Sequence, residues 1–280
     1  MLPAFLIIGA MKSGTTSLYA YLREHPEIYM PANKEPNFFS DEKVWQKGIC
    51  WYESLFDQAT NTQLCGEASV NYTKYPYYKD VPARIKTVIP NAKFIYILRN
   101  PLDRIYSHYL HNVYAGIEND SFEKAIVDKP LYVQASLYYN QIEQYLKYFS
   151  PSQILVFLLE DLQAEPLATV QKVFKFLSVN SSFVPPNINE VKHQSASKRG
   201  KDNLLMKLFR KTPIYHKLSE ITPRYLHTTS SYFLKKRIKI PDYKKKPIRK
   251  DIIELINCDI QKISSHINRD ISGWKLSIKN

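Results

Sequence analysis

The sequence predicts an α/β fold: a single domain with a P-loop-like central parallel sheet and helices on both faces. Three short apolar runs, at residues 5–8, 93–98 and 154–159, are typical of strands that are buried on both sides. A loop and a helical pattern follow each run, and strands that alternate with helices form parallel sheets. With 280 residues, 44% of them hydrophobic, the chain is long enough to bury one large core.

Turn signals and periodicity supply the elements between these strands. The first helix, from Thr15, is expected to stop before Pro26, and Pro101 suits the first position of a later helix. The turn-rich stretch 31–40 is expected to be a loop. The other expected elements are a short strand at 64–69 and helices at 52–56, 81–89, 122–127, 134–149, a segment ending at 177, 203–211, 213–220 and 248–267.

The net charge of +13 is concentrated in the C-terminal third. Residues 1–191 carry 17 Lys and Arg against 19 Asp and Glu, whereas residues 192–280 carry 22 against 7, a balance of +15. We therefore divide the domain 1–280 into a core at 1–200 and a basic, mainly helical extension at 201–280. Such a surface suits phosphates, anionic lipids or nucleic acid, with a solvated face as the plain alternative. Peripheral contact with a membrane stays open at this point.

Cysteine spacing and hydropathy exclude several classes of protein. Cys50, Cys65 and Cys258 are an odd number without a C-x-x-C pair, which indicates neither a disulfide framework nor a zinc site. No apolar segment approaches the roughly eighteen residues that span a membrane, and the first one lacks the features of a signal peptide. We therefore expect a cytoplasmic protein in a reducing compartment, without a metal.

The stretch 5–17 has the pattern of a strand, a phosphate-binding loop and a helix. Gly9 and Gly14 have the spacing of a Walker A motif, but Thr15 stands where that motif requires lysine. The lysine lies inside the loop instead, at Lys12. Glycines let backbone N–H groups approach an anion, and the helix N-terminus, lysine and hydroxyls favour its charge. An ordinary turn between strand and helix is the alternative.

Charged side chains follow the apolar strands at the edge where such a sheet binds ligands. A Walker B strand would end in aspartate and hold magnesium, whereas the strand at 93–98 runs into arginine. A bound phosphate is therefore expected to meet protein cations instead of a metal. The charged residues at these positions are Lys12, Glu67, Arg99 and Glu160.

Three segments together resemble a known enzyme family. They read Ile-Gly-Ala-Met-Lys-Ser-Gly-Thr-Thr-Ser at 8–17, Lys-Glu-Pro-Asn-Phe-Phe at 34–39, and Phe-Ile-Tyr-Ile-Leu-Arg-Asn-Pro-Leu-Asp-Arg-Ile-Tyr-Ser-His-Tyr at 94–109. They resemble sulfotransferases that use 3′-phosphoadenosine 5′-phosphosulfate (PAPS), and most of all the heparan sulfate sulfotransferase-like branch. The resemblance covers roughly residues 4–200. It implies transfer of a sulfuryl group to a hydroxyl or amine, with release of adenosine 3′,5′-bisphosphate (PAP).

The resemblance implies which residues bind PAPS. The loop for the 5′-phosphosulfate consists of Lys12, Ser13, Gly14, Thr15 and Thr16. Arg99 and Ser107, eight residues apart, bind the 3′-phosphate. The basic triplet Lys198, Arg199 and Gly200 resembles the loop that closes over this phosphate in cytosolic sulfotransferases. A plain solvated loop is the alternative.

The same resemblance assigns the chemistry. Glu35 is the expected base for the acceptor proton, because the glutamate of the matching loop has that role in heparan sulfate sulfotransferases. Lys12 stabilises charge on the departing oxygen, and its hydrogen bond is expected to switch between Ser107 and the leaving group. Lys34 adds positive charge at the acceptor. A Glu35 that only pairs with Lys34 or solvent is the alternative.

Departures from the family pattern bear on the acceptor. Asn37 and Ser40 stand in place of a histidine and an aspartate of some glucosaminyl sulfotransferases, and Ala68 in place of a lysine that binds the acceptor. These changes argue against a heparan-like acceptor. We predict a small metabolite, a natural product or a glycan precursor. Glu67 is a second candidate base, with a buried structural carboxylate as the alternative, and Glu67 and His108 are candidate acceptor contacts.

Two alternatives from other classes stay open. His108 and His111 lie three residues apart on one helix, but no carboxylate or cysteine accompanies them, so packing or a polar wall is expected instead of a metal site. A protein that binds nucleic acid or an anionic membrane on a P-loop-like fold is the rival to an enzyme, because of the basic C-terminal third. The enzyme hypothesis itself includes no nucleic acid partner.

Overall fold

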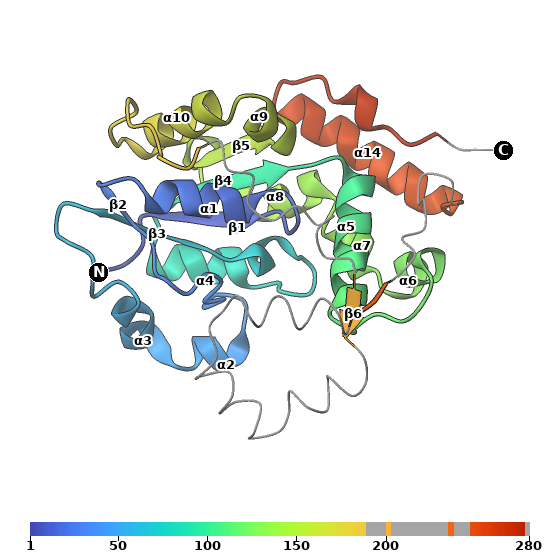
Figure 1. Ribbon diagram of the computed structural model, residues 1–280, viewed down its shortest axis with the longest axis horizontal. Coiled ribbons are helices and arrows are strands. Elements are labelled where there is room, and N and C mark those ends of the chain that lie inside the picture. Colours follow the sequence, from blue (N-terminus) through green and yellow to red (C-terminus); the bar gives the residue numbers. More distant parts are fainter. Residues whose placement is uncertain (189–199, 203–234, 238–246, 278–280) are drawn as a thin grey trace.

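A five-stranded parallel sheet forms the centre of the computed structural model, which describes residues 1–188, 200–202, 235–237 and 247–277 (Figure 1). The order across the sheet is β2-β3-β1-β4-β5, and each neighbouring pair is parallel. This confirms the predicted α/β class. The strands are β1 (Phe5–Gly9), β2 (Ile28–Tyr29), β3 (Leu64–Ala68), β4 (Lys93–Leu98) and β5 (Ile154–Leu158).

Helices cover both faces of this sheet (Figure 1). Side chains of a strand alternate between the faces, so Leu6 and Ile8 of β1 enter one core while Phe5 and Ile7 enter the other. The first core includes residues of α4, α5, α8 and α14, and the second includes residues of α1 and α10. The helices are α1 (Thr15–Arg23), α2 (Glu42–Trp45), α3 (Gly48–Ser54), α4 (Val81–Val88), α5 (Pro101–Tyr114), α6 (Phe122–Asp128), α7 (Leu131–Gln134), α8 (Tyr138–Leu146), α9 (Leu159–Ala164), α10 (Pro166–Leu177) and α14 (Lys250–His266), with short 3-10 turns at Val70–Thr73, Pro151–Gln153 and Ser272–Trp274.

The helix expected at 134–149 is shorter than expected: α8 covers only Tyr138–Leu146, and a separate short helix, α7, ends at Gln134, because tertiary contacts satisfy the polar groups between them. The fully buried Arg104 donates to the carbonyl oxygen of Tyr132 and to the hydroxyl of Ser136. Gln141 Nε2 donates to the carbonyl oxygen of Gln134 over 3.0 Å. Elsewhere the expected boundaries move slightly: α3 begins before 52, and α9 begins directly after β5.

The C-terminal helix α14 confirms the helix predicted at 248–267. Its apolar stripe, which includes Ile256 and Ile260, is buried in the first core. The Asp259 carboxylate accepts the backbone N–H groups of Tyr139 and Asn140, over 3.1 and 3.0 Å, at the start of α8. The division at residue 200 stays a prediction, although α14 shares the main core. The helices expected at 203–211 and 213–220 lie outside the described residues.

A short antiparallel pair accompanies the main sheet. Its strands are β6 (Gly200–Asp202) and β7 (Lys235–Arg237), and Gly200 is opposite Arg237. The pair contains one end of the basic triplet that the sequence assigned to the 3′-phosphate.

Candidate active site

The phosphate loop joins β1 to α1 at the carboxyl end of the sheet (Figure 1). Lys12 and Gly14 have left-handed backbone, with φ of 71° and 88°. A Cβ on Gly14 would lie 2.7 Å from Leu159 Cδ1, so both the conformation and the space favour glycine. α1 then begins at Thr15, and the first N–H groups of a helix have no partners within it. This geometry can hold an anion.

Two buried hydroxyls belong to the predicted PAPS site. Ser13, in the phosphate loop, is fully buried, and Ser107, on α5, is 6% exposed. Neither Oγ has a hydrogen-bond partner among the residues that the structure describes. Because an unsatisfied buried hydroxyl costs free energy, an anionic ligand that accepts from each would remove this cost. The residues present therefore fit a phosphorylated ligand.

Arg99 connects the end of β4 to the phosphate loop. Its Nη1 donates to the carbonyl oxygen of Lys12 over 3.0 Å, and its guanidinium is only partly buried. The hydroxyl of the buried Tyr138 donates to the carbonyl oxygen of Arg99 over 2.7 Å. The structure therefore brings Lys12 and Arg99 together, and α5, which carries Ser107, starts two residues after Arg99.

The loop that carries Glu35 is attached to the end of β3. Glu35 N–H donates to the carbonyl oxygen of Ala68, and Asn37 N–H donates to Ser69 Oγ, each over 3.0 Å. β3 is the neighbour of β1, so this loop and the phosphate loop lie at the same edge of the sheet. Lys34 Nζ forms an ion pair with Glu35 Oε1 at 2.6 Å, with 17% and 35% of the two side chains exposed. The pairing that the sequence left as an alternative is therefore present.

Glu67 is a buried carboxylate just behind this loop. Both of its oxygens accept hydrogen bonds: Oε1 from Tyr72 over 2.6 Å and Tyr52 over 3.1 Å, and Oε2 from Ser69 over 2.8 Å. Burial raises the pKa of Glu67 to about 7, the three hydrogen bonds oppose that rise, and the charge of Glu35 adds to it.

The comparisons with known proteins decide the family. A family model described as the sulfotransferase domain matches residues 2–236. This chain belongs to the sulfotransferase domain family. Membership confirms the family that the three sequence segments resemble.

Two curated mammalian enzymes illustrate the similarity of this sulfotransferase domain to heparan sulfate sulfotransferases. Mouse bifunctional heparan sulfate N-deacetylase/N-sulfotransferase 3 is 32% identical over 203 residues, which are 65% of this chain and 23% of that protein. Mouse heparan sulfate glucosamine 3-O-sulfotransferase 3B1 is 29% identical over 187 residues, 64% of this chain and 46% of that protein. This chain therefore spans less than half the length of these relatives.

A solved structure matches the sulfotransferase domain over almost its whole length. The sulfotransferase from Alicyclobacillus acidocaldarius aligns with 99% of this chain and 100% of its own, with a TM-score of 0.69 and 27% identity. A sulfotransferase domain from the curacin biosynthetic pathway shares the fold, at a TM-score of 0.54 and 13% identity. Both likenesses support the α/β fold of this chain.

His108 is a neutral, buried side chain close to Arg104 and Lys74. It lies on α5, is 3% exposed, and packs its ring 4.7 Å from that of Tyr132. Burial, and then the positive charges of Arg104 and Lys74, lower the pKa of His108 to about 2. With this pKa the imidazole is uncharged at neutral pH, and among the described residues its Nδ1 has no hydrogen-bond partner.

Lys74 is a buried cation that interacts electrostatically with Glu35 and that the sequence did not predict. It is 8% exposed, and its Nζ donates to Asn71 Oδ1 over 2.6 Å. Burial, and then the charge of Arg104, lower the pKa of Lys74 to about 8, while Glu35 opposes that shift. Its neighbour Thr73 donates to the carbonyl oxygen of Ile8 over 2.8 Å, which attaches this segment to β1.

The structure does not bring every predicted site residue to the phosphate loop. Glu160 is exposed in the first turn of α9. Lys198 and Arg199 lie outside the described residues, and Gly200 is described only as the first residue of β6. The structure therefore leaves the role of the basic triplet untested.

The part of the chain that the structure describes contains neither a candidate metal site nor a candidate membrane span. It contains no group of three or more His, Cys, Asp and Glu side chains that could hold a metal ion, His108 and His111 included. Nor does it contain a helix that is long and apolar enough to span a bilayer.

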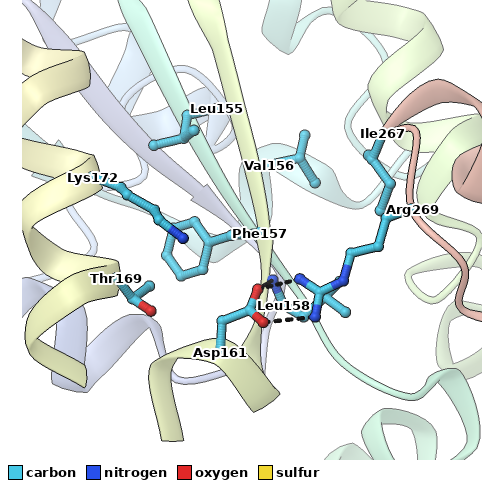
Figure 2. A pocket seen from close by; sticks show the side chains of 9 residues that line it. All are labelled: Leu155, Val156, Phe157, Leu158, Asp161, Thr169, Lys172, Ile267 and Arg269. Atoms are coloured by element: carbon cyan, nitrogen blue, oxygen red, sulfur yellow. Dashed lines mark hydrogen bonds and ion pairs between the residues drawn. The ribbon is translucent and has the colours of Figure 1, made fainter. Parts of the chain in front are cut away.

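A cavity of about 180 Å³ is lined by residues of β5, α9 and α10 and by Ile267 and Arg269 (Figure 2). Asp161 and Arg269 close one side of it with a two-pronged ion pair, one arm of which spans 2.7 Å. None of the predicted site residues lines it, so we assign the reaction to the phosphate loop instead. Its lining consists of Leu155, Val156, Phe157, Leu158, Asp161, Thr169, Lys172, Ile267 and Arg269.

Proposed function

We propose that this sulfotransferase domain transfers the sulfuryl group of PAPS to a hydroxyl or amine of a small metabolite or glycan precursor. One observation carries the proposal. The Lys12 loop, bonded to Arg99, and the Glu35 loop, bonded to Ala68, attach to adjacent strands of the sheet at the same edge. A donor and an acceptor bound at this edge would meet between a cation and a carboxylate.

PAPS supplies the sulfuryl group when it is bound. The residues proposed to hold its 5′ end are Lys12, Ser13, Gly14, Thr15 and Thr16, and those proposed for the 3′-phosphate are Arg99, Ser107, Lys198, Arg199 and Gly200. The buried, unpartnered hydroxyls of Ser13 and Ser107 support this division. Lys12 stabilises the negative charge that develops on the leaving side, where a preorganised cation is most effective in a site shielded from water.

Glu35 is the proposed base. Its carboxylate would take the proton of the acceptor O–H or N–H, which requires at least one oxygen turned toward the acceptor. Lys34 holds Oε1 in the present geometry, and moving Lys34 onto the acceptor would free that oxygen. In this arrangement Lys34 contacts the acceptor, and His108 contributes an uncharged polar wall.

The proposed acceptor class rests on the reactions of the relatives and on charged residues that this chain lacks. The relatives named above act, by their names, on heparan sulfate, through N-sulfation in one case and 3-O-sulfation in the other. Both an amine and a hydroxyl are therefore reasonable targets. Asn37, Ser40 and Ala68 leave out charged residues that glucosaminyl sulfotransferases use, so we favour a smaller or less charged acceptor, met in the cytoplasm.

Activity with radiolabelled PAPS and pools of candidate acceptors tests this proposal. We expect labelled product with the native chain, none with Glu35→Gln, and a measurable rate with Lys34→Gln, because the latter keeps the carboxylate. PAP should raise the melting temperature of all three proteins by mass action. Failure of PAP to stabilise the native chain, combined with tight and salt-sensitive DNA binding, would establish the rival function instead.

A further inference from the structure

The loop that carries Glu35 has a backbone that needs external support. Glu35 and Asn37 both have left-handed backbone, with φ of 64° and 56°. Each such residue costs free energy when it is not glycine, and it persists only where surrounding contacts impose it. One of these contacts is the bond from Glu35 N–H to the carbonyl oxygen of Ala68, and several of the others converge on a single side chain, Glu67.

The first connection from Glu67 runs through Ser69 to Asn37. Ser69 Oγ donates its one proton to Glu67 Oε2 over 2.8 Å and accepts from Asn37 N–H over 3.0 Å. In its ionised form Glu67 sets the direction of both bonds: it then has no proton to donate, so the hydroxyl must point at it and leave a lone pair for the loop. A side chain that donated to Ser69 would leave the hydroxyl proton without this acceptor.

The second connection runs through two tyrosines to the aromatic pair of the loop. Tyr52 and Tyr72 donate to Glu67 Oε1 over 3.1 and 2.6 Å. The Tyr52 ring stacks on Phe38, with centroids 4.2 Å apart and planes at 5°. The Tyr72 hydroxyl accepts from Phe39 N–H over 3.4 Å. Both halves of the loop are therefore tied to the same carboxylate.

We propose that Glu67 is a positioning residue, which holds the loop 35–39 in the geometry that points Glu35 at the acceptor. This inference rests on the proposed role of Glu35. Glu67 is 1% exposed and its two oxygens accept three hydrogen bonds, so it presents no free oxygen to an acceptor. It is therefore not the second base that the sequence left open.

Two variants separate positioning from chemistry. Glu67→Gln places an NH₂ or an oxygen against Ser69 but keeps the size of the side chain. Ser69→Ala removes the relay and its hydrogen bond to Glu67 Oε2 but leaves the carboxylate and its two tyrosine bonds in place. A matched control is Tyr145→Phe, since Tyr145 is equally buried and its hydroxyl donates to the carbonyl oxygen of Tyr72, not to Glu67. All are compared at pH 8 by hydrogen exchange of peptides covering 35–40, by PAP binding and by kcat.

We expect both variants to speed amide exchange in 35–40. We also expect them to lower kcat by at least about tenfold, the rate factor that corresponds to the loss of one hydrogen bond to a charged group. PAP affinity should stay within about twofold, because the phosphate loop is anchored elsewhere. The double variant should be no slower than the worse single one. Tyr145→Phe should leave exchange in this loop unchanged.

Unchanged exchange in both variants would overturn the proposal. A loss of kcat in Glu67→Gln without faster exchange would identify Glu67 as a base instead. If the native chain transferred no sulfuryl group at all, the exchange measurement would still decide whether Glu67 holds the loop, so this inference and the proposed function fail separately.

Discussion

Arg99 Nη1 donates to the carbonyl oxygen of Lys12 over 3.0 Å, so the residue that ends β4 supports the loop that follows β1. The bond uses one nitrogen of a planar fork with five N–H donors, and the rest of the guanidinium can bind an anion at the same time. A single side chain thereby links the shape of the phosphate loop to the charge of the bound nucleotide.

The first prediction separates these two roles with Arg99→Met and Ser107→Ala. Both should weaken PAP binding, by roughly ten- to a hundredfold for the loss of a hydrogen bond to a charged group. Only Arg99→Met should also lower the stability of the free protein, because Ser107 Oγ has no partner among the described residues whereas Arg99 holds Lys12.

Thermal melts with and without PAP measure both effects, since binding stabilises by mass action. If Ser107→Ala destabilised the free protein as much as Arg99→Met, its hydroxyl would have a structural role that conflicts with our assignment.

The second prediction concerns Lys12→Ala. Lys12 is a non-glycine residue with φ of 71°, so alanine can take its place in the same strained conformation with no new clash expected. We expect kcat to fall by about 100- to 1,000-fold, as for removal of one preorganised group at a developing charge. Steady-state kinetics with PAPS test this, with the exposed Lys175→Ala on α10 as the control for loss of one positive charge. Equal effects of the two substitutions would contradict a local role of Lys12.

The parts of this site that the sequence predicts are those that depend on local pattern. Apolar runs identified β4 and β5, and glycine spacing with an internal lysine identified the phosphate loop, because strand burial and loop conformation are set by a few adjacent residues. The sequence left Glu67 open between a base and a buried structural carboxylate, and could not decide, since its three donors come from an α3 residue and from the segment after β3.

Lys74 and Arg104 show why the rest could not be predicted. Lysine and arginine are usually exposed, and nothing adjacent in the sequence marks these two as 8% and 0% exposed. Their burial results from packing between the end of β3, α5 and α7, which are far apart in the chain. Charge counted along the sequence therefore placed the basic surface in the C-terminal third and missed two cations near the phosphate loop.

The third prediction is a pH dependence of stability caused by Glu67. Burial first, and then the charge of Glu35, raise the pKa of Glu67 from 4.5 to about 7 in the folded protein. Between those two values the folded chain keeps a proton that the unfolded chain releases. Stability should therefore fall as the pH rises from about 4.5 to 7, by at most about 3 kcal/mol, and level off above.

Glu67→Gln should flatten this fall, as measured by chemical denaturation at a series of pH values. The fall will not vanish, because burial also raises the pKa of Asp259, from 3.8 to about 6, and Asp259 stays in the variant. The same slope in the native chain and in Glu67→Gln would mean that Glu67 is ionised across this range.

The fourth prediction tests how tightly the sheet is packed beneath the site. Gly66 of β3 lies opposite Phe5 of β1, and a Cβ on Gly66 would lie 2.1 Å from Phe5 Cζ. Phe5 is fully buried, so its ring cannot move aside cheaply. Gly66→Ala should therefore destabilise the fold by about 1–3 kcal/mol or more, the usual effect of overpacking a core.

Gly273→Ala is the control for this prediction, because no heavy atom lies within 4 Å of its added methyl group. We expect it to change stability by no more than about 0.5 kcal/mol. Combining Gly66→Ala with Phe5→Leu should restore part of the lost stability, since the smaller side chain leaves room for the methyl group. Denaturant melts of the native chain, Gly66→Ala, Phe5→Leu and the double variant measure this coupling. If Phe5→Leu gave no rescue, the destabilisation would not come from the contact between these two residues.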